Sequence, residues 1–167
     1  PDWGKTMDTV NIRCRSGTIT GRVRDETILF AGIPYAEPPV GELRFKPPQP
    51  LRSSLDNFEA FKFGAAAPQV PGGGMTDSAK VRWSEDCLTL NISAPIAIRD
   101  EEEKGKRAVL VWIHGGGYRT GQGAIPWYNG TSFAKNHDII VVSMNYRLGA
   151  LGFADLTHLG EEFVTSN

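Results

Sequence analysis

The chain has 167 residues, of which 40% are hydrophobic, and its formal net charge at pH 7 is −1. A chain of this length can bury a sizeable core as one domain. The near-neutral charge without a basic stripe argues against a nucleic-acid partner, and no apolar run reaches the roughly 18 residues that a membrane span needs. Two cysteines and three scattered histidines predict neither a disulfide framework nor a metal site, and we expect no cofactor.

The first part of the chain is predicted to form short antiparallel strands. Apolar and polar residues alternate in Thr9–Cys14 and in residues 18–24, and the string RSG at 15–17 between them is a hairpin signal. A third strand is expected over residues 27–31. Prolines recur over residues 34–50, which predicts an irregular, extended segment with few ladder hydrogen bonds.

The second part of the chain is predicted to combine strands with short helices. Residues 55–74 predict a loop with one helical turn, and residues 87–93 alternate as a strand. Residues 108–113 form a continuous apolar run, which is typical of a central parallel strand covered on both faces. A short helix over 132–137 and a β-branched strand over 138–144 follow, and a further helix is expected to begin near the end of the chain. The sequence therefore predicts an α/β protein whose antiparallel starting strands lead into a mostly parallel central sheet.

A glycine triplet follows the predicted central strand. Gly115, Gly116 and Gly117 come directly after His114. Consecutive glycines allow positive φ and bring backbone N–H groups close to a ligand, and after such a strand they are typical of an oxyanion-hole loop. A flexible turn is the alternative for glycines alone, but the strand and the histidine favour the oxyanion loop. His114 itself is interpreted as a hydrogen-bonding residue that fixes the loop.

Four strings of the sequence carry a further signal. They are FAGIPYAEPPVG at 30–41 with LRF at 43–45, SEDCLTLN at 84–91, HGGGY at 114–118, and NYRLG at 145–149 followed by GF at 152–153. In this order and spacing they resemble the type-B carboxylesterase/lipase family, which includes the cholinesterases. The resemblance implies an α/β-hydrolase fold and ester hydrolysis through a Ser-His-acid triad and an acyl-enzyme. Residues 1–167 would then be the N-terminal portion of a single catalytic domain.

The resemblance gives roles to the residues around the glycine triplet. The backbone N–H groups of Gly116 and Gly117 would be two oxyanion donors, Gly115 would shape the loop, and a third donor would follow the nucleophilic serine. Three aromatic residues after the loop, Tyr118, Trp127 and Tyr128, would line a pocket for a small-molecule ester. For Trp127 and Tyr128, ordinary packing is an equally weighted alternative.

Other matched residues would be structural. By resemblance Arg44 and Glu85 form a buried ion pair, and the alternative from the residues alone is that both are solvated. Arg147 would pair with an acidic residue that lies beyond Asn167.

The chain departs from the family at Cys87. Many members pair this cysteine with one near the position of Ala67, so here Cys87 is expected to be a free, buried, structural thiol. The compartment, secreted or cytoplasmic, stays open because the disulfide argument is lost. Asn129 stands in a sequon and is a glycosylation candidate only in a secreted protein, whereas the sequon residue Asn91 is expected to be buried.

The triad itself is missing from this sequence. No serine has glycines at both −2 and +2, so there is no nucleophile elbow. In the family's chain order the serine, acid and histidine follow the NYRLG string, so we expect them beyond Asn167 in a remainder that acts as the partner of this portion.

Two alternatives remain open at this stage. A non-catalytic cholinesterase-like adhesion domain would keep the same strings, although it has no need of oxyanion glycines. Hormone-sensitive-lipase-like hydrolases also carry HGGG, but they usually continue with YRLAPE where this chain has YRLGA at 146–150. The type-B family fits better.

Overall fold

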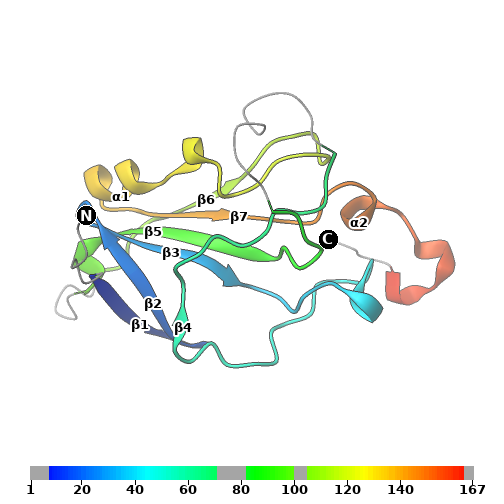
Figure 1. The fold of residues 1–167 in the computed structure, drawn as a ribbon, viewed down its shortest axis with the longest axis horizontal. Helices are drawn as coiled ribbons and strands as arrows, with labels where there is room; N and C mark the ends of the chain where they lie inside the picture. The colour runs from blue at the N-terminus through cyan, green and yellow to red at the C-terminus, as the bar shows by residue number, and fades with distance from the viewer. Residues whose placement is uncertain (1–7, 71–81, 100–104, 164–167) are drawn as a thin grey trace, which may run out of the picture.

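A mixed sheet of seven strands organises the part of the chain that the structure describes (Figure 1). The structure, a computed structural model, describes residues 8–70, 82–99 and 105–163. Along the chain the strands are β1 (Thr9–Cys14), β2 (Gly17–Arg24), β3 (Thr27–Pro34), β4 (Phe58–Glu59), β5 (Thr89–Pro95), β6 (Val109–Ile113) and β7 (Ile140–Met144). The sheet order is β1-β2-β3-β5-β7-β6, and β4 pairs with β2.

The antiparallel start that the sequence predicts is confirmed. Strands β1 and β2 form a tight hairpin in which Cys14 lies opposite Gly17. Strand β3 pairs with β2 and β5 and continues to Pro34, three residues further than expected. The register shifts between Phe30 and Ile33. At this irregularity Gly32 has a φ of +73°, and its N–H donates to Asn91 Oδ1 at 2.9 Å. A side-chain acceptor thus replaces the lost ladder partner.

The parallel part of the sheet begins at β6 and β7. These strands are parallel neighbours, and the chain between them forms the glycine loop, the 3₁₀ helix η3 (Pro126–Tyr128) and the helix α1 (Thr131–His137). Helix α1 contacts β3, β5 and β7. It ends because Asp138 takes a left-handed φ of 51°, so β7 starts two residues later than expected. The predicted order of strand, glycine loop, short helix and parallel strand is confirmed.

The central, covered position expected for residues 108–113 is not seen among the described residues. Strand β6 lies at the edge of the sheet, and its residues Val109–Ile113 are between 42% and 66% exposed. A continuous apolar run indicates that a strand can be buried on both faces. Among the described residues, however, β6 has no strand on its side away from β7 and no layer that covers its faces.

The irregular segments follow the predictions in part. Residues after β3 are extended apart from the 3₁₀ turn η1 (Gly41–Leu43), as the prolines predict. The helical turn expected within residues 55–74 is wrong as far as Val70: the short strand β4 takes its place, because Ile19 and Thr20 of β2 pair with Phe58 and Glu59. Residues 71–74 lie outside the described ranges.

Short helices complete the chain. They are η2 (Ile96–Arg99), α2 (Gly149–Phe153), η4 (Thr157–Leu159) and η5 (Glu161–Phe163). Helix α2 lies at the end of the sheet toward which β7 points (Figure 1). The helix expected near the end of the chain falls partly on residues 164–167, which lie outside the described ranges.

The two faces of the sheet differ in polarity. On one face Ile28 and Phe30 of β3 form a core cluster, with Leu90 and Ile92 of β5 packed against it. On the other face polar side chains such as Asn91 and Ser143 are buried. In the described part of the chain no helix is both long and apolar enough to cross a membrane.

Candidate active-site loop

The glycine loop and the NYRLG string meet at the carboxyl ends of β6 and β7. Because the two strands are parallel neighbours, the residues that follow them emerge at the same edge of the sheet. Tyr146 Oη donates a hydrogen bond of 2.6 Å to His114 O, and the two rings stack with their centroids 4.4 Å apart. Gly149 N–H donates to Tyr118 O at 2.7 Å. Residues of the NYRLG string therefore hold the glycine loop in place at both His114 and Tyr118.

His114 fixes the start of the loop, as the sequence predicts. Its side chain is buried, and Nδ1 lies 2.9 Å from Gly115 O. Since a carbonyl oxygen can only accept, Nδ1 carries the proton of this bond. Burial lowers the pKa of His114 and so favours the neutral ring.

Two residues of the glycine triplet have positive φ angles, which glycine adopts without strain. Gly116 has a φ of +130° and Gly117 a φ of +59°. A Cβ added at Gly116 would lie 1.9 Å from Thr120 O, so no larger residue fits without movement of the loop. Gly116 O accepts hydrogen bonds from Arg119 N–H and Thr120 N–H at 3.1 and 3.2 Å. In the described part of the chain the N–H groups of Gly116 and Gly117 have no acceptor. Gly115 has open space around its Cα.

Three side chains hold the far end of the loop. The carboxamide of Gln69 accepts from Gly121 N–H at 2.8 Å and donates to Gly121 O at 2.9 Å. Asn145 Oδ1 accepts from Gly123 N–H at 2.7 Å, and Ser143 Oγ donates to Gly123 O at 2.8 Å. The loop has no strand partner here, so these side chains satisfy its backbone groups.

Sequence reasoning missed these supporting residues. Asn145 could have been found, because it opens the NYRLG string directly after a buried strand. Gln69 gave no local signal, since its partner Gly121 is 52 residues away along the chain.

An open pocket of about 620 Å³ lies beside the loop. It is lined by Pro68, Gln69, Val70, Gly116, Arg119, Thr120 and residues 148–151. Its volume falls within the range of roughly 300–1,000 Å³ that is typical of small-molecule sites.

The structure places none of the three predicted aromatic residues on the wall of this pocket. Tyr118 packs its ring against Phe153, with 4.7 Å between the centroids. Helix η3 brings Tyr128 against Trp112 of β6 at 5.1 Å, beside a separate cavity over the polar face of the sheet. Trp127 is 75% exposed. Tyr118 and Tyr128 therefore make packing contacts within this portion, and the substrate-pocket role predicted for the three aromatic residues stays a prediction.

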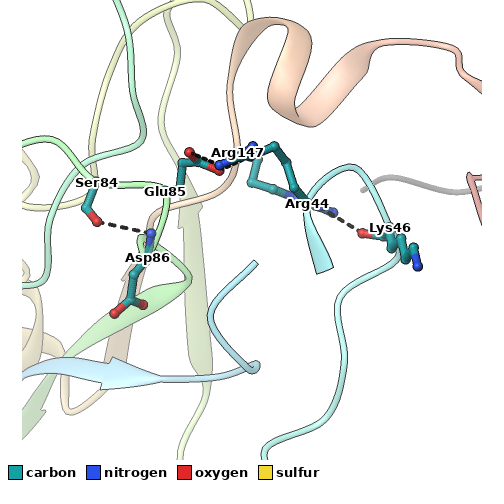
Figure 2. Close-up of polar contacts among 6 residues, drawn as sticks. All are labelled: Arg44, Lys46, Ser84, Glu85, Asp86 and Arg147. Carbon is teal, nitrogen blue, oxygen red and sulfur yellow. Dashed lines mark hydrogen bonds and ion pairs between the residues drawn. The ribbon is translucent and has the colours of Figure 1, made fainter. Parts of the chain in front are cut away.

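Arg44 and Glu85 meet in a two-pronged ion pair (Figure 2). Arg44 Nε and Nη2 donate to the two carboxylate oxygens of Glu85 at 2.5 and 2.8 Å. The hydrogen bond to Glu85 raises the pKa of Arg44. The side chains are 45% and 28% exposed, so the expected burial of the pair is wrong in this structure. Its geometry still ties the proline-rich segment to the chain before β5.

Arg147 lies beside this pair and is buried (Figure 2). Its Nη1 donates to Lys46 O at 2.8 Å, which joins the NYRLG string to the proline-rich segment. Burial lowers the pKa of Arg147. The acidic partner expected beyond Asn167 stays a prediction.

Both cysteines are free thiols. Cys87 is buried in one apolar cluster with Ala67, Ala36, Leu88 and Leu148. Ala67, near which the resemblance implies a disulfide partner in many members, therefore packs in the same cluster as Cys87. Burial raises the pKa of the Cys87 thiol to about 12, which leaves almost no thiolate at neutral pH.

Alkylation should separate the two thiols. At pH 8 we expect iodoacetamide to modify Cys14, which is exposed, and to leave Cys87 unmodified until denaturant is added. Peptide-resolved mass spectrometry of the native protein measures both sites, and the denatured protein, in which both react, is the control. Equal labelling of the two sites in the native protein would contradict the burial of Cys87.

The two sequons differ in accessibility. Asn91 is buried as predicted, and its Nδ2 donates to Ser143 Oγ at 3.2 Å. Asn129 is exposed, and its Oδ1 accepts from Thr131 N–H and Oγ1 at 3.0 and 2.6 Å. Asn129 therefore meets the requirement of exposure, and its glycosylation stays a prediction.

The mixed sheet with a glycine loop at the carboxyl end of β6 defines an α/β-hydrolase fold. It superposes on a solved PNB esterase with a TM-score of 0.84 at 34% identity, over 94% of this chain and 32% of that one. It also superposes on a carboxylesterase of Geobacillus stearothermophilus with a TM-score of 0.80 at 38% identity, over 94% and 30% of the two chains.

The sequence gives the family. The model of the carboxylesterase family matches residues 7–163, and the chain belongs to this family. It is 42% identical to a phenmedipham hydrolase of Pseudarthrobacter oxydans, over 89% of this chain and 30% of the relative. It is 43% identical to a cholinesterase of Mus musculus, over 81% of this chain and 24% of the relative. The chain thus spans less than a third of these relatives' length.

Proposed function

We propose that this chain supplies the oxyanion-stabilising loop of a carboxylic ester hydrolase that acts through a Ser-His-acid triad. The observation that carries the proposal is the loop geometry: the N–H groups of Gly116 and Gly117 have no acceptor in the described residues, and Gly116 lines the adjacent pocket. Membership of the carboxylesterase family supports it. We propose further that the triad and the third donor lie in the remainder of the polypeptide.

The chemistry assigned to this chain is charge stabilisation. When a serine attacks the ester carbonyl, the carbonyl oxygen becomes negatively charged in the tetrahedral intermediate. Two fixed N–H donors stabilise this charge without reorganising, and each is worth about 10²–10³ in rate. The side chains that hold Gly121 and Gly123 keep the loop in place.

We propose that residues 1–167 form the N-terminal portion of one α/β-hydrolase domain. The exposed edge and faces of β6 support this, because a parallel apolar strand is normally paired and covered. A strand of the remainder would pair with β6 on the side away from β7.

The test is hydrolysis of p-nitrophenyl butyrate by the complete polypeptide and by residues 1–167 alone, with labelling by a fluorophosphonate that reacts with activated serines. We expect the complete polypeptide to turn over the ester and to be labelled, and residues 1–167 to do neither. A folded complete polypeptide that neither hydrolyses the ester nor takes the label would overturn the proposal in favour of a non-catalytic domain.

A further inference from the structure

The pocket beside the glycine loop has a charged residue on its wall. Arg119 is the one charged residue among those that line the described pocket, and Gly116 contributes to the same wall. Arg119 N–H donates to Gly116 O at 3.1 Å, so the backbone of this arginine is anchored to the proposed oxyanion loop. Arg119 therefore lines the space where the substrate of the proposed esterase would lie.

The polar neighbours of Arg119 are already engaged. The carboxamide of Gln69 uses its oxygen and nitrogen on Gly121, and the nitrogen also donates to Ala67 O at 3.0 Å. Thr120 Oγ1 faces Gly116 O at 3.4 Å. These side chains hold the loop and have little capacity left for a ligand.

The described residues do not provide an acidic partner for Arg119. A carboxylate does lie nearby, because the smaller cavity that contains Glu85 shares Pro68 and Leu151 with this pocket. Both oxygens of Glu85, however, accept from Arg44. The pocket therefore presents a positive charge whose donors are available to a ligand.

We propose that Arg119 binds a carboxylate carried by the substrate, so that the preferred substrates are esters with an anionic group. A guanidinium presents a planar fork of donors that matches a carboxylate, and a charge-assisted pair of this kind is stronger than a neutral hydrogen bond. The inference rests on the proposed ester hydrolysis and names the substrate class for it. The carboxylate can stand on the acyl part or on the alcohol part of the ester.

Matched substrates separate these two positions. For the acyl part, mono-p-nitrophenyl glutarate is compared with p-nitrophenyl valerate; for the alcohol part, carboxymethyl butyrate is compared with propyl butyrate. The complete polypeptide is expected to prefer the anionic member of at least one pair. In Arg119→Gln, KM for that anionic ester should rise about 10- to 100-fold. The kcat for that anionic ester should change much less, because a remote carboxylate contributes to binding in ground and transition states alike. The neutral member has no carboxylate for Arg119 to bind, so its KM should change far less than that of the anionic ester.

Two control variants isolate the role of the charge. Arg119→Lys should restore part of the preference, since it keeps the charge without the fork. Arg15→Gln removes the same charge from the β1–β2 hairpin and should leave the preference unchanged.

The inference is overturned if Arg119→Gln hydrolyses neutral esters normally and keeps the wild-type ratio of anionic to neutral kcat/KM. That result would leave the proposed ester hydrolysis intact. A wild-type protein that hydrolyses no ester would overturn both proposals.

Discussion

Replacing Gly116 with alanine in the complete polypeptide is expected to lower kcat for a neutral ester by about 10²–10³, with a much smaller change in KM. The physical reason is steric. A Cβ at this position would lie 1.9 Å from Thr120 O, and the φ of +130° disfavours any L side chain. The backbone has to shift, and the shift moves a donor that acts on the transition state rather than on the bound substrate.

Two further alanine variants make the test specific. Gly117→Ala keeps its N–H and finds open space, so only the positive φ of +59° opposes it, and a smaller loss of kcat is expected. Gly105→Ala lies outside the loop with open space around it and should be neutral. Steady-state kinetics with p-nitrophenyl butyrate measures all three. Wild-type kcat in a folded Gly116→Ala protein would remove the oxyanion role from this loop.

Proline is a poor probe of the same donors. It deletes the N–H at residue 117, but it also fixes φ near −65°. Because Gly117 has a φ of +59°, the substitution changes the backbone and the donor together. Loss of activity in such a variant would not identify the cause.

Local patterns were sufficient for the first strands and for the position of the loop. The alternation in Thr9–Cys14 and the turn before Gly17 specify a hairpin without information from the rest of the chain. The glycine triplet was predictable because it follows an apolar strand directly. The sequence could not indicate that β6 lies at an edge here, since an apolar run describes what a strand tolerates and not what packs on it.

Parts of the site depend on contacts that the local sequence does not show. Tyr128 is near the glycine loop along the chain, but helix η3 places its ring against Trp112. Gln69 and Arg119 line the same pocket although they are far apart along the chain. The resemblance located the loop, and the fold decided which side chains face the pocket.

Asn145 is expected to be the residue on which the stability of the loop depends most. Its side chain is buried, accepts from Gly123 N–H at 2.7 Å and donates to Ala65 O at 2.9 Å. Asn145→Ala leaves both backbone groups buried without these partners. A buried unsatisfied group costs about 1–3 kcal/mol, so two of them should lower the free energy of unfolding by about 2–6 kcal/mol.

Asn11→Ala is the matched control for this loss. Asn11 also makes a side-chain hydrogen bond, since its Oδ1 accepts from Thr20 Oγ1 at 2.8 Å, but it lies on the exposed hairpin, where water can replace the partner. Its replacement should change the free energy of unfolding by no more than about 0.5 kcal/mol. Denaturant unfolding of the complete polypeptide compares the two variants. If both unfold at the wild-type midpoint, Asn145 does not hold the loop. If only Asn145→Ala loses stability and its kcat falls as well, the bond to Gly123 links the folding of the β7 end to the geometry of the oxyanion donors.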